Sequence, residues 1–154
     1  MSVSGTPTRR EALKFSGLLG VLAGIGLLSP TQVLASSDPA FAAKSLEDAL
    51  KLLGATPTPS ADILLTSPDI AENGAVVQVG VQSKLPATQE IHLLVEKNVN
   101  PLVASFTLNE GVAPFVQTRV RMGQSTLVWA LVKADGRWYS ASKESKVTLG
   151  GCGG

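Results

Sequence analysis

The chain has 154 residues, enough for one domain with short attachments, and 44% of them are hydrophobic. A formal net charge of +1 and the lack of a basic cluster outside the N-terminus exclude nucleic-acid binding driven by bulk charge. The single cysteine cannot form an intramolecular disulfide, so the fold must depend on its hydrophobic core.

The N-terminus has the pattern of an export signal. Arg9 and Arg10 precede an apolar run over residues 15–28, which is shorter than the ~20 residues of a membrane-spanning helix. A positive segment followed by such a run is typical of a signal peptide, and the paired arginines resemble a twin-arginine signal. We therefore predict a signal peptide over residues 1–42, cleaved after Ala35 or Ala42, a periplasmic location and no stable membrane anchor.

The mature domain is predicted over residues 43–149 and begins with one short helix. Ser45 is placed to cap the helix, and Gly54 is placed to end it. Leu46, Leu50 and Leu53 fall on one face at helical spacing, which predicts that this face lies on a core.

Beyond this helix the sequence has the pattern of short strands separated by turns. The predicted segments are 63–65, 75–82, 90–96, 103–108, 115–122, 125–133, 138–140 and 146–149. Asp135-Gly136 is a hairpin signal that joins two of them. Seven or eight such strands predict an all-β, immunoglobulin-like antiparallel β-sandwich with one short N-terminal helix and a flexible C-terminal arm.

Polar residues within the predicted strands give no specific signal of catalysis or metal binding. His92, the only histidine, is predicted on the polar face of its strand, without a second metal ligand nearby. Arg119 and Arg121 share one side of a strand, which indicates either a solvated face or a patch for an acidic partner. We therefore predict no catalytic residue, no metal site and no bound cofactor.

Three aromatic residues raise the question of an interface. Trp129 lies in a segment that is apolar on both faces, so this strand is either central in the sandwich or covered by another protein. Trp138 and Tyr139 point to opposite faces, so one of them is a candidate for an interface.

The C-terminus carries the only cysteine on a short glycine segment. Cys152 lies between Gly150-Gly151 and Gly153-Gly154. Glycine restricts the backbone least, so we predict a flexible carrier arm over residues 150–154. A free thiol titrates near pH ~8.5, and the sequence offers no nearby cation to lower that value. The pattern therefore favours Cys152 as a site of covalent attachment that delivers a group to other proteins.

These terminal residues resemble the SoxY family of sulfur carrier proteins, whose hallmark is a terminal Gly-Gly-Cys-Gly-Gly. The resemblance extends through residues 70–75, 96–98, 103–106 and 118–121, and the twin-arginine leader fits it. It implies a periplasmic carrier, without catalysis of its own, that holds thiosulfate-derived intermediates on Cys152.

The resemblance also implies the partners. It implies a heterodimer with a SoxZ-like β-sandwich subunit, and visits by the arm to a c-type cytochrome, a dimanganese hydrolase and a sulfane dehydrogenase. The metals would belong to those partners, and no nucleic acid would be involved.

Two other functions remain open at this point. One is a Gly-Gly-terminal sulfur carrier that is activated at its carboxylate, although such activation is cytoplasmic. The other is an interaction module in which Cys152 forms a disulfide that locks an assembly.

Overall fold

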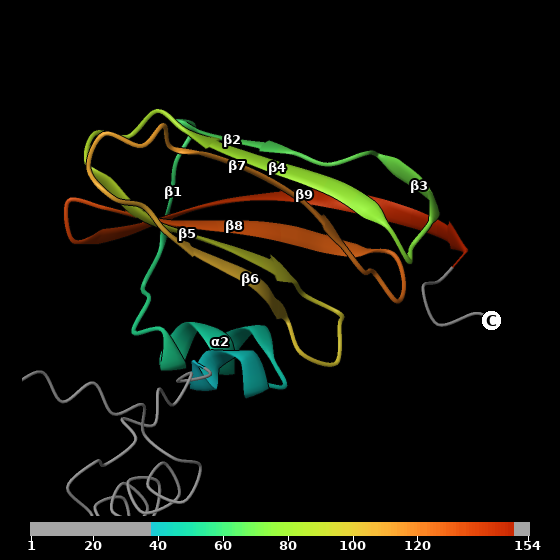
Figure 1. Cartoon of the computed structure of the whole chain (residues 1–154). Coiled ribbons are helices and arrows are strands. Elements are labelled where there is room, and N and C mark those ends of the chain that lie inside the picture. The colour runs from blue at the N-terminus through green and yellow to red at the C-terminus, as the bar shows by residue number, and fades with distance from the viewer. Residues whose placement is uncertain (1–37, 150–154) are drawn as a thin grey trace, which may run out of the picture. The chain divides into compact units, whose positions relative to one another are not determined.

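The computed structural model describes residues 38–149, which form a two-sheet β-sandwich with short helical segments on one outer face (Figure 1). The predicted sandwich is therefore confirmed. A 3-10 helix, η1 (Pro39–Ala42), comes first and is followed by α2 (Leu46–Leu52). Nine strands follow: β1 (Thr58–Pro59), β2 (Ile63–Thr66), β3 (Ile70–Asn73), β4 (Val77–Ser83), β5 (Thr88–Val95), β6 (Leu102–Thr107), β7 (Phe115–Val120), β8 (Thr126–Ala134) and β9 (Arg137–Leu149).

The helix α2 begins and ends as the sequence predicts. The Ser45 Oγ accepts a hydrogen bond from the backbone N–H of Asp48 at 3.1 Å, which satisfies one of the free donors of the first turn. Gly54 follows the helix with a φ of +62°, a conformation that costs glycine little. In Figure 1 the helix lies beneath strands β5, β8 and β6, on the face turned away from the other sheet.

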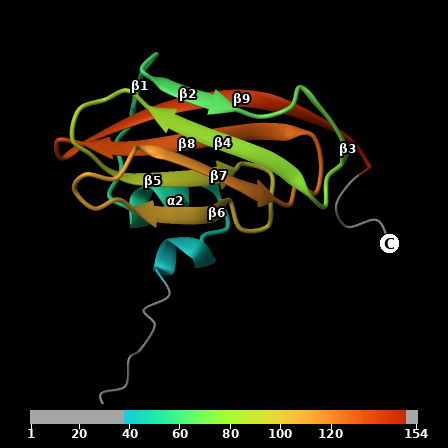
Figure 2. The ribbon, with the colours of Figure 1, turned by 45° about the horizontal axis from the view of Figure 1, so that its top comes forward.

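The larger sheet has the order β1-β9-β8-β5-β6, and the smaller sheet has the order β2-β4-β7. Figure 2 shows the smaller sheet lying over the larger one. Most pairings are antiparallel, as predicted. Two are not, since β1 and β3 both run parallel to β9. The sequence did not indicate these pairings, because β1 and β3 are short and are joined to β9 only through contacts distant in the chain.

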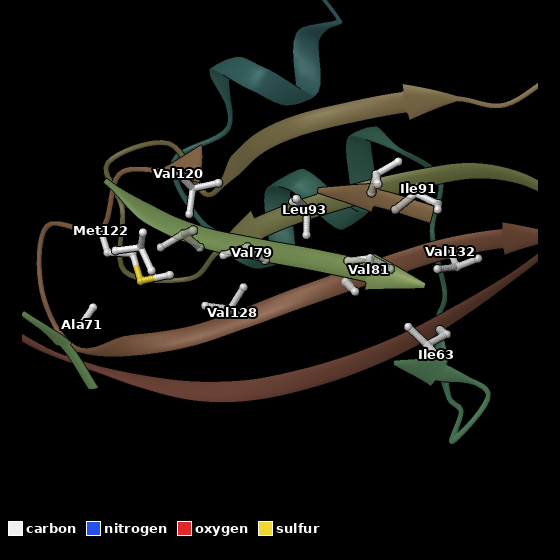
Figure 3. Close-up of a cluster of buried hydrophobic side chains, with 14 residues drawn as sticks. Ile63, Ala71, Val79, Val81, Ile91, Leu93, Val120, Met122, Val128 and Val132 are labelled. Atoms are coloured by element: carbon white, nitrogen blue, oxygen red, sulfur yellow. The ribbon is translucent and has the colours of Figure 1, made fainter. Parts of the chain in front are cut away.

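The main core fills the space between the two sheets. Val79 and Val81 of β4 point toward Leu93 of β5 and Val128 of β8, and all four side chains have no exposed surface (Figure 3). Alternate residues on β4 and β5 reach this core because successive side chains of a strand point to opposite faces. The predicted strands over residues 75–82 and 90–96 therefore correspond to β4 and β5.

A second, smaller core lies between the larger sheet and the helical segments. It is closed by partly buried hydrophobic residues of α2 and by the two tryptophans. Its fully or nearly fully buried members are Ala40, Ala43, Ala49, Leu94, Leu102 and Leu131. Strands β5 and β8 therefore contribute apolar side chains to both faces, which explains why the segment around Trp129 is apolar throughout.

Candidate functional site

The predicted site residues, Cys152 and its neighbours Gly150, Gly151, Gly153 and Gly154, lie outside the described residues. The structure does describe the strand that leads to them. Strand β9 ends at Leu149, at the same end of the sandwich as β3, and Figure 1 shows both at the right. The structure therefore describes where the glycine segment is attached to the sandwich, which is the end of β9.

A parallel strand holds the last four residues of β9. Strand β3 pairs with them in the register Ile70↔Lys146, Ala71↔Val147 and Asn73↔Leu149. On the opposite side of β9, the Val147 N–H donates to the Ser125 Oγ at 2.9 Å. The Thr148 hydroxyl donates to the carbonyl of Glu72, also at 2.9 Å. Side-chain and backbone hydrogen bonds thus hold the chain as far as Leu149, the residue directly before the glycines.

A polar cluster fastens the chain ahead of β3 to the middle of β9. The hydroxyls of Ser67 and Ser145 lie 2.6 Å apart, both on buried residues, and the Ser145 hydroxyl donates to the Pro68 carbonyl. The Lys143 ammonium donates to the Ser67 carbonyl at 2.6 Å and lies 3.0 Å from a carboxylate oxygen of Asp69. Buried hydroxyl groups are almost always hydrogen-bonded, and a shift of β3 along β9 would break these contacts. The cluster therefore favours the observed register of β3 on β9.

These anchoring residues were not predicted. No strand was predicted between residues 65 and 75, whereas β3 includes residues 70–73. Residues 138–140 and 146–149 read as two strands, whereas β9 runs through both without a break. The three serines and one threonine spaced along β9 are the one signal that could have indicated side-chain anchoring. The partners could not be read from the sequence, since Ser67 and Ser145 are 78 positions apart.

The two arginines of the predicted patch line separate hollows. Arg119 lies on the outer face of the smaller sheet beside Gln78 and Gln117. Arg121 follows the end of β7 and, with Lys97, lines a hollow of about 510 Å³ between the β5–β6 and β7–β8 loops. Asn98 joins these loops, since its Nδ2 donates to the Arg121 carbonyl at 2.7 Å and its Oδ1 accepts from the Gly123 N–H at 3.2 Å.

His92 is buried, so the expectation that it lies on a polar face of its strand is wrong. Only 2% of the residue is exposed, since it points toward the helix side of the larger sheet. Its Nε2 lies 3.1 Å from a Glu90 carboxylate oxygen, and its ring centroid lies 5.4 Å from that of Trp138. The Lys133 ammonium lies 2.9 Å from the other Glu90 oxygen. The strand face that carries His92 is covered by residues near the N-terminus, which periodicity within one strand could not reveal.

Burial and hydrogen bonding together determine the charge state of this cluster. Desolvation lowers the pKa of His92 below its ordinary value, although the hydrogen bond and charge of Glu90 act in the opposite direction. Burial raises the pKa of Glu90, but hydrogen bonds from Lys133 and His92 outweigh it, so the pKa of Glu90 lies below its ordinary value. His92 is therefore neutral and Glu90 ionised near neutral pH. The His92 Nδ1 is buried without a hydrogen-bond partner among residues 38–149.

This depressed pKa predicts that acid destabilises the domain through His92. The unfolded chain takes up a proton near pH ~6.5, whereas the folded chain does so only at lower pH. The free energy of unfolding should therefore decrease as the pH falls below ~6.5 and level off below the folded pKa. Urea denaturation at a series of pH values measures this slope.

The chain has no other histidine, so His92→Gln is a clean comparison. Between about pH 7 and 5, the variant should show a flatter dependence than the unchanged chain, because glutamine does not titrate. Parallel curves for the two proteins would contradict the assignment. The Glu90 contribution is lost at lower pH, since stability from a depressed carboxylate pKa is lost as the pH falls through that pKa.

The aromatic residues occupy the positions that the strand pattern indicated. Strand β8 is central, between β5 and β9, and the Trp129 indole N–H donates to a Glu96 carboxylate oxygen at 2.9 Å. Trp138 packs on the helix side, and Tyr139 packs on the core between the sheets. Both tryptophans therefore have a structural role in this chain.

Neither a metal site nor a membrane span is found in the described part of the chain. Residues 38–149 contain no group of three or more His, Cys, Asp or Glu side chains placed to hold a metal ion. In the same residues, no helix has both the length and the apolarity needed to cross a membrane.

Comparisons with known proteins point to one family. The profile of the family described as "Sulfur oxidation protein SoxY" matches residues 49–152, a range that ends at the cysteine. Among solved structures, the chain is similar to the sulfur carrier protein SoxY from Chlorobium limicola f thiosulfatophilum, with 36% identity and a TM-score of 0.61. That match covers 68% of this chain and 97% of the other. A search of curated proteins found no match.

A more distant likeness concerns the fold alone. The superoxide reductase (neelaredoxin) from Ignicoccus hospitalis shares 18% identity at a TM-score of 0.50, covering 55% of this chain and 79% of the other. A variant of the same reductase shares 20% identity at the same TM-score, covering 65% and 86%. At such identities only the sandwich is shared, because unrelated functions recur on one fold.

Proposed function

The chain belongs to the SoxY family of sulfur oxidation proteins, and we propose that it carries thiosulfate-derived groups covalently on Cys152 in the periplasm. The family establishes a carrier role in sulfur oxidation. The cysteine, the cargo and the compartment are the parts that we propose.

One observation carries this proposal. The only thiol of the chain lies three residues beyond the end of β9 and has a pair of glycines on each side. At about 3.3–3.6 Å per residue, this spacing allows the thiol to reach roughly 10 Å from Leu149. Since β3 fixes β9 up to that residue, the sandwich can stay at the entrance of a partner's active site while the thiol enters it.

The chemistry of the cargo follows from thiol–disulfide chemistry. Oxidative coupling forms an S–S bond between the Cys152 sulfur and the outer sulfur of thiosulfate. It releases the thiol proton and transfers a pair of electrons to a c-type cytochrome partner. Hydrolysis of the resulting thiosulfonate by water then breaks its S–SO₃ bond, releases sulfate and leaves a persulfide on Cys152. The oxidant and the hydrolase belong to partner proteins, so this chain supplies only the attachment atom.

Partner proteins complete the proposed system. Family membership supports a SoxZ-type subunit as the stable partner, together with other Sox proteins that receive the cargo. We assign electron transfer, hydrolysis and sulfane oxidation to a c-type cytochrome, a dimanganese hydrolase and a sulfane dehydrogenase. Support for a passive thiol comes from the sequence, which places neither a cation nor the sole histidine, His92, within the glycine segment.

Export is the second component of the proposal. The paired arginines Arg9 and Arg10 and the apolar run over residues 15–28 support the twin-arginine route, which transports folded proteins.

Intact mass spectrometry tests the proposed carrier function of Cys152 directly. After incubation of the exported chain with thiosulfate and the partner proteins, sulfur adducts are expected on the C-terminal peptide. Unmodified C-terminal peptide under turnover conditions would contradict the proposal.

Deleting Gly153-Gly154 separates this function from a carrier activated at its carboxylate. The deletion removes the terminal diglycine but keeps Cys152, so adduct formation should persist at a reduced rate, because the thiol loses the glycines on one side. Mass spectrometry of the adduct and thiosulfate-dependent turnover are the measurements. Complete loss of both, with the fold intact by circular dichroism, would favour the carboxylate mechanism.

A further inference from the structure

Two small-residue sites for signal-peptide cleavage, ending at Ala35 and Ala42, lie seven residues apart. We propose that folding selects between them, so that cleavage follows Ala35 and Ser36 becomes the mature N-terminus. This inference relies on the proposed export, and it goes beyond it by assigning the processing site. It follows from how residues 38–43 are built into the domain.

These residues form a capped segment in which Ala40 and Ala43 are buried. The Asp38 carboxylate accepts a hydrogen bond from the Ala40 N–H at 2.9 Å and thereby caps η1, which continues to Ala42. Ala40 has no exposed surface, and Ala43 is 5% exposed. Both belong to the second core, together with Leu131 of the central strand β8.

Distant residues hold the segment in place. The Asn100 side chain, in the β5–β6 loop, donates to the Ala43 carbonyl at 3.2 Å. The negative charge of Asp38 acts on His92, which lies in β5 on the covered face of the sheet. Residues 38–43 are thus held to the sandwich by hydrogen bonds and packing, and they form part of the folded domain.

A peptidase that cuts after Ala42 would need this segment in an open form. Proteolysis requires the local backbone to leave its folded contacts, and residues in a cooperative core open rarely. The residue two positions ahead of Ala42 is Ala40, which is fully buried. If the chain crosses the membrane already folded, the second site is packed before it meets the peptidase. Ala35 lies three positions before Asp38 in the sequence and is not part of the packed segment 38–43.

Cleavage after Ala42 would also damage the domain. It would remove Ala40 from the second core and Asp38 from the neighbourhood of His92. It would also place a charged α-amino group on Ala43, and burying an unpaired charge is costly. Selection of the first site therefore preserves the packing of the second core.

The test is the mass of the exported protein made from the full-length gene. The form that begins at Ser36 should exceed the form that begins at Ala43 by at least about tenfold, since that ratio needs an opening free energy of only ~1.4 kcal/mol. An exported chain that begins at Ala43 overturns this inference alone. A chain that is neither exported nor cleaved overturns the export proposal as well.

Matched variants sharpen the test. Ala42→Leu removes the small residue of the second site at an exposed position, so processing should be unchanged. Ala35→Leu removes the small residue of the first site, so the mature form should fall by about tenfold or more. The reverse pattern, with loss only in Ala42→Leu, would show that the second site is used and would refute the inference.

Discussion

Replacing Cys152 with serine should abolish both the sulfur adduct and thiosulfate-dependent turnover of the reconstituted system. Serine keeps the size and polarity of the side chain, but its hydroxyl neither forms S–S bonds nor ionises near neutral pH. The residue lies beyond the last described strand, so thermal unfolding should be unchanged. Intact mass and turnover with partner proteins are the two measurements.

A displaced thiol is the matched control for this substitution. Ser142 is exposed in the middle of β9, where it pairs with Trp129. The double variant Cys152→Ser/Ser142→Cys keeps one thiol per chain but holds it on the sheet. It should react with a small alkylating agent and still fail in turnover, because a strand residue cannot enter a narrow active site. Full turnover by either variant would refute the carrier role of Cys152.

The largest effect on stability is expected for Leu131→Ala. Leu131 has no exposed surface and lies in the second core, between the central strand and the helical segments. Removing most of a buried leucine side chain costs about 2–5 kcal/mol, through lost burial and the cavity that remains. Urea denaturation should show this loss as a lower midpoint with an unchanged slope. The melting temperature should fall by about 10 °C or more.

Leu127→Ala is the control for Leu131→Ala. Leu127 lies on the same strand and, four residues away, on the same face, but it is 36% exposed. Its loss should cost under about 1 kcal/mol. Equal destabilisation by the two variants would show that the second core adds little stability. Since neither residue lies near the glycine segment in sequence, alkylation of Cys152 should proceed normally in both.

Local patterns predicted most of the fold because they depend on neighbouring residues. The cap at Ser45 and the stop at Gly54 predicted α2 nearly to the residue. The predicted strand over residues 75–82 corresponds to β4, and Asp135-Gly136 predicted the β8–β9 hairpin.

Other features depended on contacts distant in the chain and were not predicted. Strand β3 has little apolar alternation of its own and is ordered by pairing with β9 and by the Ser67–Ser145 contact. His92 was placed on a polar face because its own strand alternates, yet a segment some 50 residues earlier covers it. Alternation identifies two faces of a strand, but it cannot say what covers the second face.

The proposed chemistry of this protein rests on the sequence alone. One thiol, four flanking glycines and an export pattern are properties of residue type and order, and they require no fold to be recognised. Only the tertiary structure decided how that thiol is attached, since β3 and the hydroxyls of Ser125 and Thr148 hold β9 to its last residue. It also placed residues 38–43 within the domain, because the burial of Ala40 depends on Leu131 and its neighbours, which are distant in sequence and adjacent only after folding.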